Sequence, residues 1–370
     1  MVSSKLDLLL SDFQPRPMLT TAVTEITTPR FPVIDAHNHL GSAFIPVGGE
    51  DDFRNRPVGE LLATMDASGV QAMINLDGQF GDALKHQLAR YQEPHPDRFA
   101  VFSGVDYDNW SVDPNFGETE AQRLQEAVAM GARGLKVWKT LGLRLRDSRG
   151  HLIPIDDERL DPMWQAAAEL NVPVLIHIAD PVAFFEPLDR FNERWEELHG
   201  HPDWHFYPTR PAGSDNSHPD FPTFMELMDQ FESLIRRHSG TTFIGAHVGC
   251  YAENLGWVSR VMRECPNFYA DISARIAELG RQPYASRDFF LAHPDQILFG
   301  TDLTPDPAMY QIYYRFVETR DEYFNYGTEP IPGVGRWQIY GLDLPDDVLR
   351  KFYFDNANRL IFKGALTPAW

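Results

Sequence analysis

Eight short apolar segments, each followed by a stretch with helical spacing, constrain this sequence more than any other feature. The candidate strands are residues 32–36, 71–76, 100–104, 134–138, 172–178, 241–246, 268–272 and 296–300. The helical stretches that follow them are residues 59–68, 82–91, 118–130, 159–170, 224–238, 252–264, 286–293 and 308–323. Apolar strands that alternate with helices are typical of a parallel sheet covered by helices. Eight such units predict a closed (β/α)8 TIM barrel, an α/β fold.

The chain has 370 residues, whereas a barrel of this kind uses about 250. We assign the surplus to an N-terminal arm (residues 1–31), a long insertion after the fifth strand (181–222), a Gly/Pro-rich loop (326–344) and a closing helix (345–363). Residues 32–370 then form a single barrel domain, with the insertion over its catalytic face. An open doubly wound sheet is the alternative, but the first strand lacks the G-x-G-x-x-G turn typical of that fold.

The charge balance limits what the chain can bind. With 33 Lys+Arg against 53 Asp+Glu, the formal net charge is −20, which disfavours nucleic acids and anionic membranes as partners. The sequence contains neither a secretory signal nor an apolar run of about 18 residues. Its two cysteines, Cys250 and Cys265, provide no disulfide framework. We therefore expect a cytoplasmic protein that acts on a small-molecule substrate, with a homo-oligomer left open.

Ionisable residues lie where four of the predicted strands end. His37 and His39 end the first strand, His177 the fifth, His247 the sixth, and Asp302 follows the eighth. Because side chains alternate along a strand, His37 and His39 are expected on the same face. The carboxyl ends of barrel strands meet at one face of the barrel, so these five side chains are expected to converge.

Each of these residues also has an ordinary explanation. A single histidine at a strand end is commonly structural, and an aspartate there is commonly a helix cap. Five such residues on four strands are hard to obtain by chance, and burying them unpaired would cost several kcal/mol. A divalent metal ion would supply the missing partner. Imidazole and carboxylate ligands favour Zn, with Mn or Fe as alternatives.

These segments also resemble a known family. The motifs that carry the resemblance are Ile34-Asp35-Ala36-His37-Asn38-His39, His177, Gly245-Ala246-His247, Phe299-Gly300-Thr301-Asp302 and the closing Asn356-Ala357-Asn358-Arg359-Leu360. They resemble the amidohydrolase superfamily, and the last is similar to the tail of the amidohydrolase-2 branch, which contains aminocarboxymuconate-semialdehyde decarboxylase. The resemblance covers residues 32–362. That branch includes hydrolases, lactonases, hydratases and non-oxidative decarboxylases.

The resemblance implies roles for individual residues. His37, His39, His177 and Asp302 would ligate one metal ion, and His247 would be the catalytic histidine beside it. A bound metal lowers the pKa of its water toward about 7. Asp302 would then ligate the ion or act as the base that takes the water's proton. His247 would polarise a substrate carbonyl, as an electrophile, or protonate a leaving group, as an acid.

Lys136, in the fourth strand, is open to two interpretations. In binuclear members of the superfamily a carbamylated lysine on this strand bridges two metal ions, so a second metal is an alternative. The branch signature favours one ion, and Lys136 would then bind a substrate carboxylate or oxyanion. Lys139 is the rival if the strand faces the other way, and a lysine that extends to the barrel rim is the ordinary alternative.

The substrate pocket is defined less sharply by the sequence. Arg275, after the seventh strand, is expected to reach the mouth of the barrel and pair with a carboxylate or with the oxygens of a carbohydrate. A salt bridge to a neighbouring loop is the ordinary alternative. Aromatic residues of the insertion are expected mainly to pack it onto the barrel. We expect His199 and His201 to face solvent, and Glu196-Glu197 to be a solvated charge run.

The sequence leads to one principal hypothesis and two alternatives. The principal hypothesis is a metal-dependent hydrolase of a C–O or C–N bond in a small substrate. Its alternative is a non-oxidative decarboxylase, a carbon–carbon lyase of the same branch. Some aromatic-acid decarboxylases of the branch have Glu-x-His on the first strand, whereas this chain has His37-Asn38-His39, which tilts the choice slightly toward hydrolysis. A non-catalytic metal-binding protein is the third hypothesis, which His247, lying outside the ligand set, disfavours.

Overall fold

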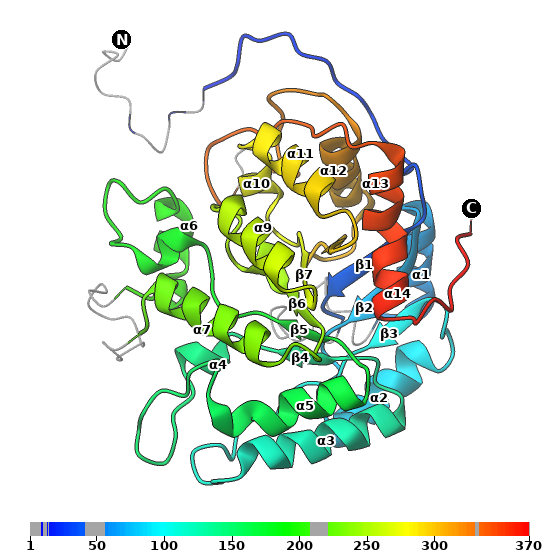
Figure 1. The fold of residues 1–370 in the computed structure, drawn as a ribbon. Helices are drawn as coiled ribbons and strands as arrows, with labels where there is room; N and C mark the ends of the chain where they lie inside the picture. The colour runs from blue at the N-terminus through cyan, green and yellow to red at the C-terminus, as the bar shows by residue number, and fades with distance from the viewer. Residues whose placement is uncertain are drawn as a thin grey trace.

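Parallel strands form the centre of the molecule and helices surround them (Figure 1). The computed structural model describes residues 9, 13, 15–40, 56–207, 221–329 and 333–369. All eight predicted strands are present, most of them shorter than predicted. They are β1 (Val33–Asn38), β2 (Val70–Asn75), β3 (Phe99–Val101), β4 (Leu135–Val137), β5 (Val174–Ile176), β6 (Phe243–Gly245), β7 (Phe268–Asp271) and β8 (Ile297–Leu298).

Backbone hydrogen bonds close these strands into a ring. Continuous ladders run in the orders β1-β2-β3 and β4-β5-β6-β7-β8, all of them parallel. A parallel bridge between Ser103 and Leu135 joins β3 to β4. At the other seam, the N–H of Ala36 in β1 donates to the carbonyl of Phe299 beside β8, at 2.9 Å. The predicted (β/α)8 barrel is therefore confirmed, and the alternative of an open doubly wound sheet is wrong.

The predicted helices are also present, with shifted ends. The longer ones are α1 (Val58–Ala67), α2 (Gly81–Gln87), α3 (Phe116–Met130), α5 (Asp161–Glu169), α7 (Phe224–Arg237), α9 (Leu255–Glu264), α11 (Pro283–Ala292) and α12 (Pro307–Glu318). Short helices that we did not predict are α4 (Thr140–Leu143), α6 (Trp195–Gly200), α8 (Ala246–Gly249) and α10 (Ile276–Leu279). We predicted the last barrel helix to run to residue 323, but α12 ends at Glu318, where the chain becomes extended at Thr319. A π-helical turn at Lys351–Asp355 interrupts the predicted closing helix and separates α13 (Asp346–Arg350) from α14 (Asn356–Leu360).

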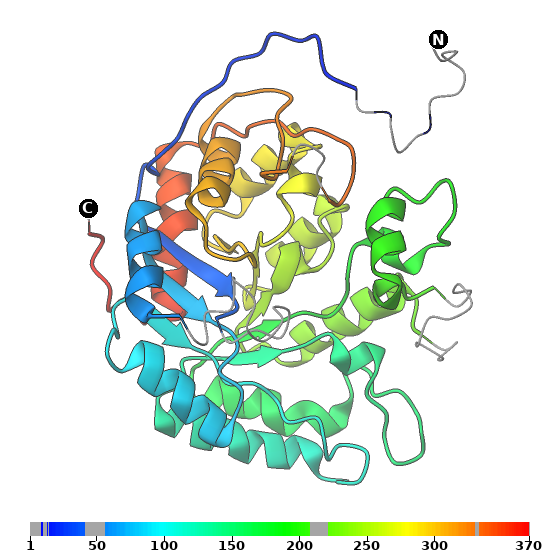
Figure 2. The ribbon, with the colours of Figure 1, turned by 180° about the vertical axis from the view of Figure 1, so that it is seen from behind.

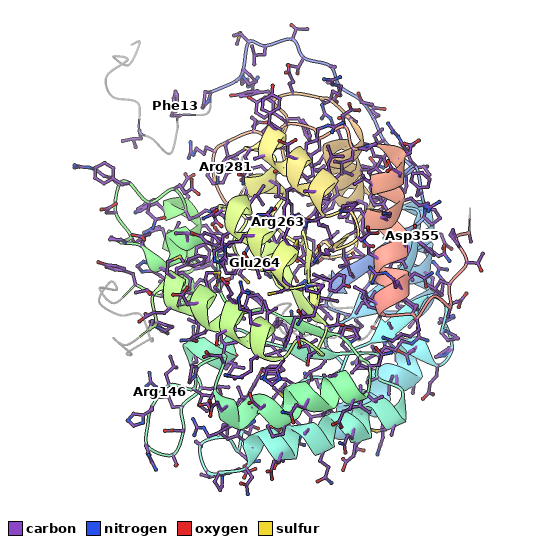
Figure 3. All side chains as sticks on the ribbon, in the orientation of Figure 1. Phe13, Arg146, Arg263, Glu264, Arg281 and Asp355 are labelled. Carbon is purple, nitrogen blue, oxygen red and sulfur yellow. The ribbon has the colours of Figure 1, made fainter. Side chains whose placement is uncertain are left out.

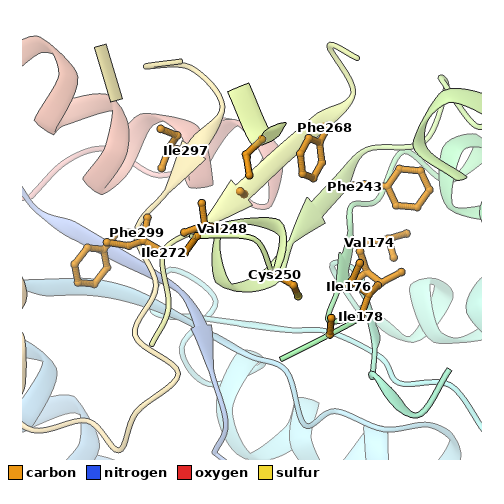
Figure 4. Packing of buried hydrophobic residues seen from close by; sticks show 14 of the residues in the cluster. Val174, Ile176, Ile178, Phe243, Val248, Cys250, Phe268, Ile272, Ile297 and Phe299 are labelled. Atoms are coloured by element: carbon orange, nitrogen blue, oxygen red, sulfur yellow. The ribbon is translucent and has the colours of Figure 1, made fainter. Parts of the chain in front are cut away.

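Two apolar layers hold the barrel together. Alternate residues of β5 to β8, among them Val174, Phe243 and Phe268, contribute to the larger layer (Figure 4). The intervening residues Leu175 and Ile244 belong to a separate buried cluster that includes residues of α14. Both faces of these strands are thus apolar, and the polar side chains lie at the carboxyl ends of the strands.

The two segments outside the barrel repeat differ in how they are held. Residues 15–31 contain neither helix nor strand and run along the outside of the molecule (Figure 2). They are tied down by Thr24, which donates to Asp321, and by Arg30, which pairs with Glu318. The described part of the insertion contains α6 and two 3-10 turns, whereas its residues 208–220 lie outside the described chain. In the part of the chain that the structure describes, no helix combines the length and apolarity needed to span a membrane.

Candidate metal centre

Side chains from two strand ends, those of β1 and β6, converge on the carboxylate of Asp302, which follows β8. The Nε2 atom of His39 lies 3.2 Å from Oδ1 of Asp302, and Nε2 of His37 lies 3.6 Å from the same oxygen. The Nε2 atom of His247 lies 3.6 Å from the other carboxylate oxygen, Oδ2. Gly300 permits this approach, because a Cβ there would lie only 2.9 Å from the Cβ of His37. The structure thus brings together four of the five residues that we predicted to converge.

Protein groups hold the second ring nitrogen of each imidazole. Nδ1 of His37 lies 2.9 Å from a carboxylate oxygen of Asp271, and Nδ1 of His39 lies 2.7 Å from one of Asp77. Nδ1 of His247 lies 2.8 Å from the main-chain carbonyl of Ser273. Carboxylate and carbonyl oxygens only accept hydrogen bonds, so each Nδ1 carries the proton. Where the ring is neutral, its Nε2 presents a lone pair toward Asp302, whereas a second proton on His39 makes its Nε2 a donor to Asp302 at 3.2 Å.

This arrangement fits a bound cation. Imidazole lone pairs and a carboxylate are all acceptors, and acceptors that face one another need a cation or a proton between them. At His39 the raised pKa supplies that proton, and a bound metal ion would take its place. The ligand atoms of His37, His39 and Asp302 all lie within 4.8 Å of one another, which suits one metal ion. Imidazoles held by carboxylate or carbonyl groups through the remote nitrogen are the usual surroundings of a metal site.

The pKa values of the cluster residues are shifted because these groups lie close together and are buried. Burial alone would lower the pKa of His39, but the charges of Asp77 and Asp302 outweigh burial and raise it to about 9. Burial opposes ionisation of Asp302 too, yet the neighbouring imidazoles, His37 foremost, hold its pKa well below the ordinary value. Burial lowers the pKa of His247 far enough to keep that ring neutral.

His177 reaches the same region in a different orientation. Its ring packs edge-on against His247, with 4.4 Å between ring centroids. Its Nε2, however, lies 3.0 Å from the carbonyl oxygen of Ala179 and 3.5 Å from Asp180. Desolvation lowers the pKa of His177 to about 4. Ligation of a metal ion by His177 remains a prediction.

The two lysines that competed for a role in the site occupy different positions. Lys136 in β4 is fully buried, and its Nζ lies 3.5 Å from Nε2 of His37. Burial lowers the pKa of Lys136 to about 8, although nearby carboxylates oppose the shift. Lys139 instead pairs with Asp180 at 2.5 Å on the wall of the cavity. The lysine beside the metal ligands is thus Lys136, and its carbamylation or contact with substrate remains a prediction.

A cavity of about 730 Å³ opens from the cluster toward the insertion. Arg275 lines it, is 8% exposed, and donates to the carbonyl of Ala274. Among the described residues, no carboxylate lies within 4.0 Å of the Arg275 guanidinium. The wall also contains three aromatic residues of the insertion, Phe184, Trp204 and Phe206. The insertion therefore contributes to the lining of the cavity.

The charged residues of the insertion depart from our prediction. His199 and His201 are exposed, as expected, and so is Glu196. Glu197, predicted to be solvated, lines the cavity and pairs with the buried Arg194 at 2.6 Å. Arg194 also pairs with Glu278 of α10, a contact that joins segments 84 residues apart and that no local pattern indicates.

Sequence reasoning missed the residues that hold the histidines. Asp77 follows β2, Asp271 ends β7, and Ser273 comes two residues later. All three obey the rule that polar residues at strand ends face the site. That rule could have found both carboxylates, had it been applied to the second and seventh strands.

Comparison with known proteins agrees with this geometry. A family model described as amidohydrolase matches residues 34–363, so the chain belongs to the amidohydrolase family. No curated protein matches the chain. The family resemblance read from the sequence motifs is confirmed.

Solved structures support the fold. A 2,6-dihydroxybenzoate decarboxylase from Rhizobium has a TM-score of 0.57 and 18% identity, covering 91% of this chain and 100% of its own. A 5-carboxyvanillate decarboxylase from Novosphingobium aromaticivorans, in complex with manganese and a nitrobenzoic acid, has a TM-score of 0.56 and 13% identity, covering 92% and 100%. A manganese-bound dihydroxybenzoic acid decarboxylase from Polaromonas has a TM-score of 0.55 and 17% identity, covering 91% and 98%.

Proposed function

We propose that this protein is a metal-dependent, non-oxidative decarboxylase of a small aromatic carboxylic acid. The observation that carries the proposal is the buried guanidinium of Arg275, which shares a cavity with His39, His247 and Asp302 and has no carboxylate partner among the described residues. A buried arginine of this kind is suited to bind a substrate carboxylate. The decarboxylases named above support this reaction over the hydrolysis that we favoured from the sequence.

We assign metal binding and binding of the substrate ring to different residues. His37, His39 and Asp302 would hold the divalent ion, with His177 as a further ligand, and manganese and zinc both suit these donors. When bound, the ion supplies a Lewis acid for an oxygen of the substrate. Phe184, Trp204 and Phe206 would stack on an aromatic ring and exclude water.

Decarboxylation breaks one bond and transfers one proton. The carbon–carbon bond to the carboxyl group breaks, carbon dioxide leaves, and the electron pair left on the ring carbon takes a proton. Neutral His247, fixed by Ser273 through Nδ1, can take a proton from solvent water at Nε2 and transfer it to that carbon, where it forms the new C–H bond. Neither an oxidant nor a reductant is needed.

Hydrolysis is the second candidate, and the position of Asp302 favours it. Its carboxylate is 19% exposed and faces the cavity, where it could accept a proton from a water molecule. Product analysis separates the two reactions. The metal-loaded protein should release carbon dioxide from hydroxybenzoic acids, whereas incorporation of ¹⁸O from labelled water into an ester, lactone or amide product would establish hydrolysis instead.

Substitution of Arg275 tests the observation that carries the proposal. Arg275→Met should raise KM for the acid about 10- to 100-fold, because a charged hydrogen bond to the substrate is lost, with a smaller effect on kcat. Arg263→Met is the matched control, since Arg263 lies on the outer surface at α9 and donates to Ser259 (Figure 3). An unchanged KM in Arg275→Met would remove Arg275 from substrate binding.

A further inference from the structure

Asp271, which has no role in the reaction proposed above, contacts both His37 and the backbone at His247. It ends β7 and is fully buried. Its Oδ2 accepts from Nδ1 of His37 at 2.9 Å. Its Oδ1 accepts three hydrogen bonds: from the backbone N–H of His247 at 3.0 Å, the backbone N–H of Ser273 at 3.0 Å and the hydroxyl of Ser273 at 2.5 Å. A single carboxylate therefore links the ends of β1, β6 and β7.

The backbone that Asp271 holds at His247 is unusual. His247, Val248, Gly249 and Cys250 have φ values of 58°, 60°, 63° and 61°, four consecutive residues in the left-handed region. That conformation costs about 1–2 kcal/mol for each residue other than glycine, and it persists only where the surroundings enforce it. Val248 and Cys250 are buried in the apolar layer (Figure 4), which fixes the middle and end of the turn. The bond to Asp271 fixes its beginning, at His247.

We infer that Asp271 is a positioning residue with two tasks, one for each of its oxygens. Oδ2 keeps the proton of His37 on Nδ1, so that Nε2 is free to bind a metal ion. Oδ1 anchors the left-handed turn, so that the His247 ring faces Asp302. The first task rests on the metal dependence proposed above.

An asparagine at this position separates the two tasks. If the amide nitrogen faces His37, Nδ1 must accept, the ring proton moves to Nε2, and Nε2 cannot bind a metal ion. If the amide turns over, its nitrogen faces the N–H groups of His247 and Ser273, and donor meets donor. One orientation therefore prevents His37 from binding a metal ion, and the other removes the anchor of the left-handed turn, although the side chain keeps its size.

Metal affinity measures the first task without any substrate. Wild-type and Asp271→Asn proteins are equilibrated with Mn²⁺ or Zn²⁺ against a chelator of known affinity, and bound metal is determined by elemental analysis. We expect Asp271→Asn to bind about 10- to 100-fold more weakly, as is usual when a group that orients a histidine ligand is lost. Glu318→Gln is the matched control. Glu318 is a buried carboxylate that accepts from Tyr353 and pairs with Arg30, and it belongs neither to the cluster nor to the cavity lining. This variant should therefore lose stability and keep wild-type metal affinity.

The outcomes separate the two proposals. Wild-type affinity in folded Asp271→Asn would overturn the positioning role while leaving the metal centre intact. A wild-type protein that binds neither ion would overturn both.

A measurement on the wild-type chain makes the test independent of whether the variant folds. In metal-free protein labelled with ¹⁵N at histidine, the shifts of His37, assigned by comparison with His37→Gln, should show the proton on Nδ1. A proton on Nε2 would overturn the inference.

Discussion

Two aspartates lie at the seam between β1 and β8 and have different surroundings. Asp35 in β1 accepts from the N–H of Thr301 at 3.1 Å, the hydroxyl of Thr301 at 2.8 Å and the hydroxyl of Tyr310 at 2.8 Å. The amide of Asn38 donates to it as well, at 3.2 Å. Each of these side-chain and backbone partners of Asp35 is a hydrogen-bond donor. The protein itself therefore satisfies this carboxylate.

Asp302 instead faces imidazole nitrogens, which can bind either a proton or a metal ion. Its nearest neighbours are the Nε2 atoms of His37, His39 and His247, whose protons are held on Nδ1 by other groups. Burial raises the pKa of Asp35 although its hydrogen bonds oppose the shift, whereas the imidazoles lower the pKa of Asp302 in spite of its burial. The residue type is the same, although Asp35 is fully buried and the Asp302 carboxylate is 19% exposed. The polarity of the partners separates a structural carboxylate from one suited to a cation.

Replacing Asp302 should give the largest effect on activity. Asp302→Asn removes the negative charge and the proton acceptor, so turnover should fall by about 10²- to 10⁴-fold. The free energy of unfolding of the metal-free protein should fall less than in an Asp35 variant, because the new amide is partly exposed and can donate to a neutral imidazole. Steady-state kinetics and urea unfolding of metal-free protein measure the two quantities. Full turnover, or a stability loss as large as that of an Asp35 variant, would contradict the comparison.

Replacing Asp35 should give the reverse pattern. The amide nitrogen of Asp35→Asn cannot accept from Thr301 or Tyr310, and an unsatisfied buried donor costs about 1–3 kcal/mol. The free energy of unfolding should fall by that amount, while bound metal per chain stays at the wild-type level. Urea unfolding and elemental analysis check both statements. A variant that loses its metal at wild-type stability would show that Asp35 belongs to the metal centre.

The contrast between these aspartates also shows which features of the fold and the site the sequence can predict. Short apolar runs that alternate with stretches of helical spacing predict the barrel, because both patterns arise from local burial. The carboxyl ends of parallel strands lie together whatever the loops do, so the convergence of His37, His39, His247 and Asp302 follows from position alone. Position does not distinguish Asp35 from Asp302, since the distinction depends on which partners fold against each one.

Features set by packing between distant segments could not be predicted. His177 lies at the expected strand end, but the carbonyl of Ala179 determines where its Nε2 points. The preferences of Val248 and Cys250 oppose the left-handed turn that they adopt, because that turn is enforced from outside the segment. The buried pair of Arg194 with Glu278 depends on how the insertion docks onto α10, which no local pattern encodes.

A third carboxylate extends the comparison to the surface and should give the smallest effect. Glu232 of α7 accepts from Arg260 of α9 at 2.6 Å and from Arg236 at 2.7 Å, and Arg236 also pairs with Glu264 at the end of α9 (Figure 3). Hydrogen bonds from Arg260 and then Arg236 lower the pKa of Glu232 from 4.5 to about 2, against its partial burial. Since the folded-state pKa is the lower one, the stabilisation is complete above pH 4.5 and is lost as the pH falls toward 2.

Solvent limits the size of this effect, because the arginine side chains are 38% and 43% exposed. Glu232→Gln should therefore lower the free energy of unfolding by less than about 1 kcal/mol at pH 7, and by less still in 1 M salt. Urea unfolding of both proteins between pH 7 and pH 3 should show the difference shrinking as the pH falls. A difference that grows with acidity would mean that Glu232 is destabilising when ionised. Donors would then not suffice to make a carboxylate structural, and the contrast between Asp35 and Asp302 would need another cause.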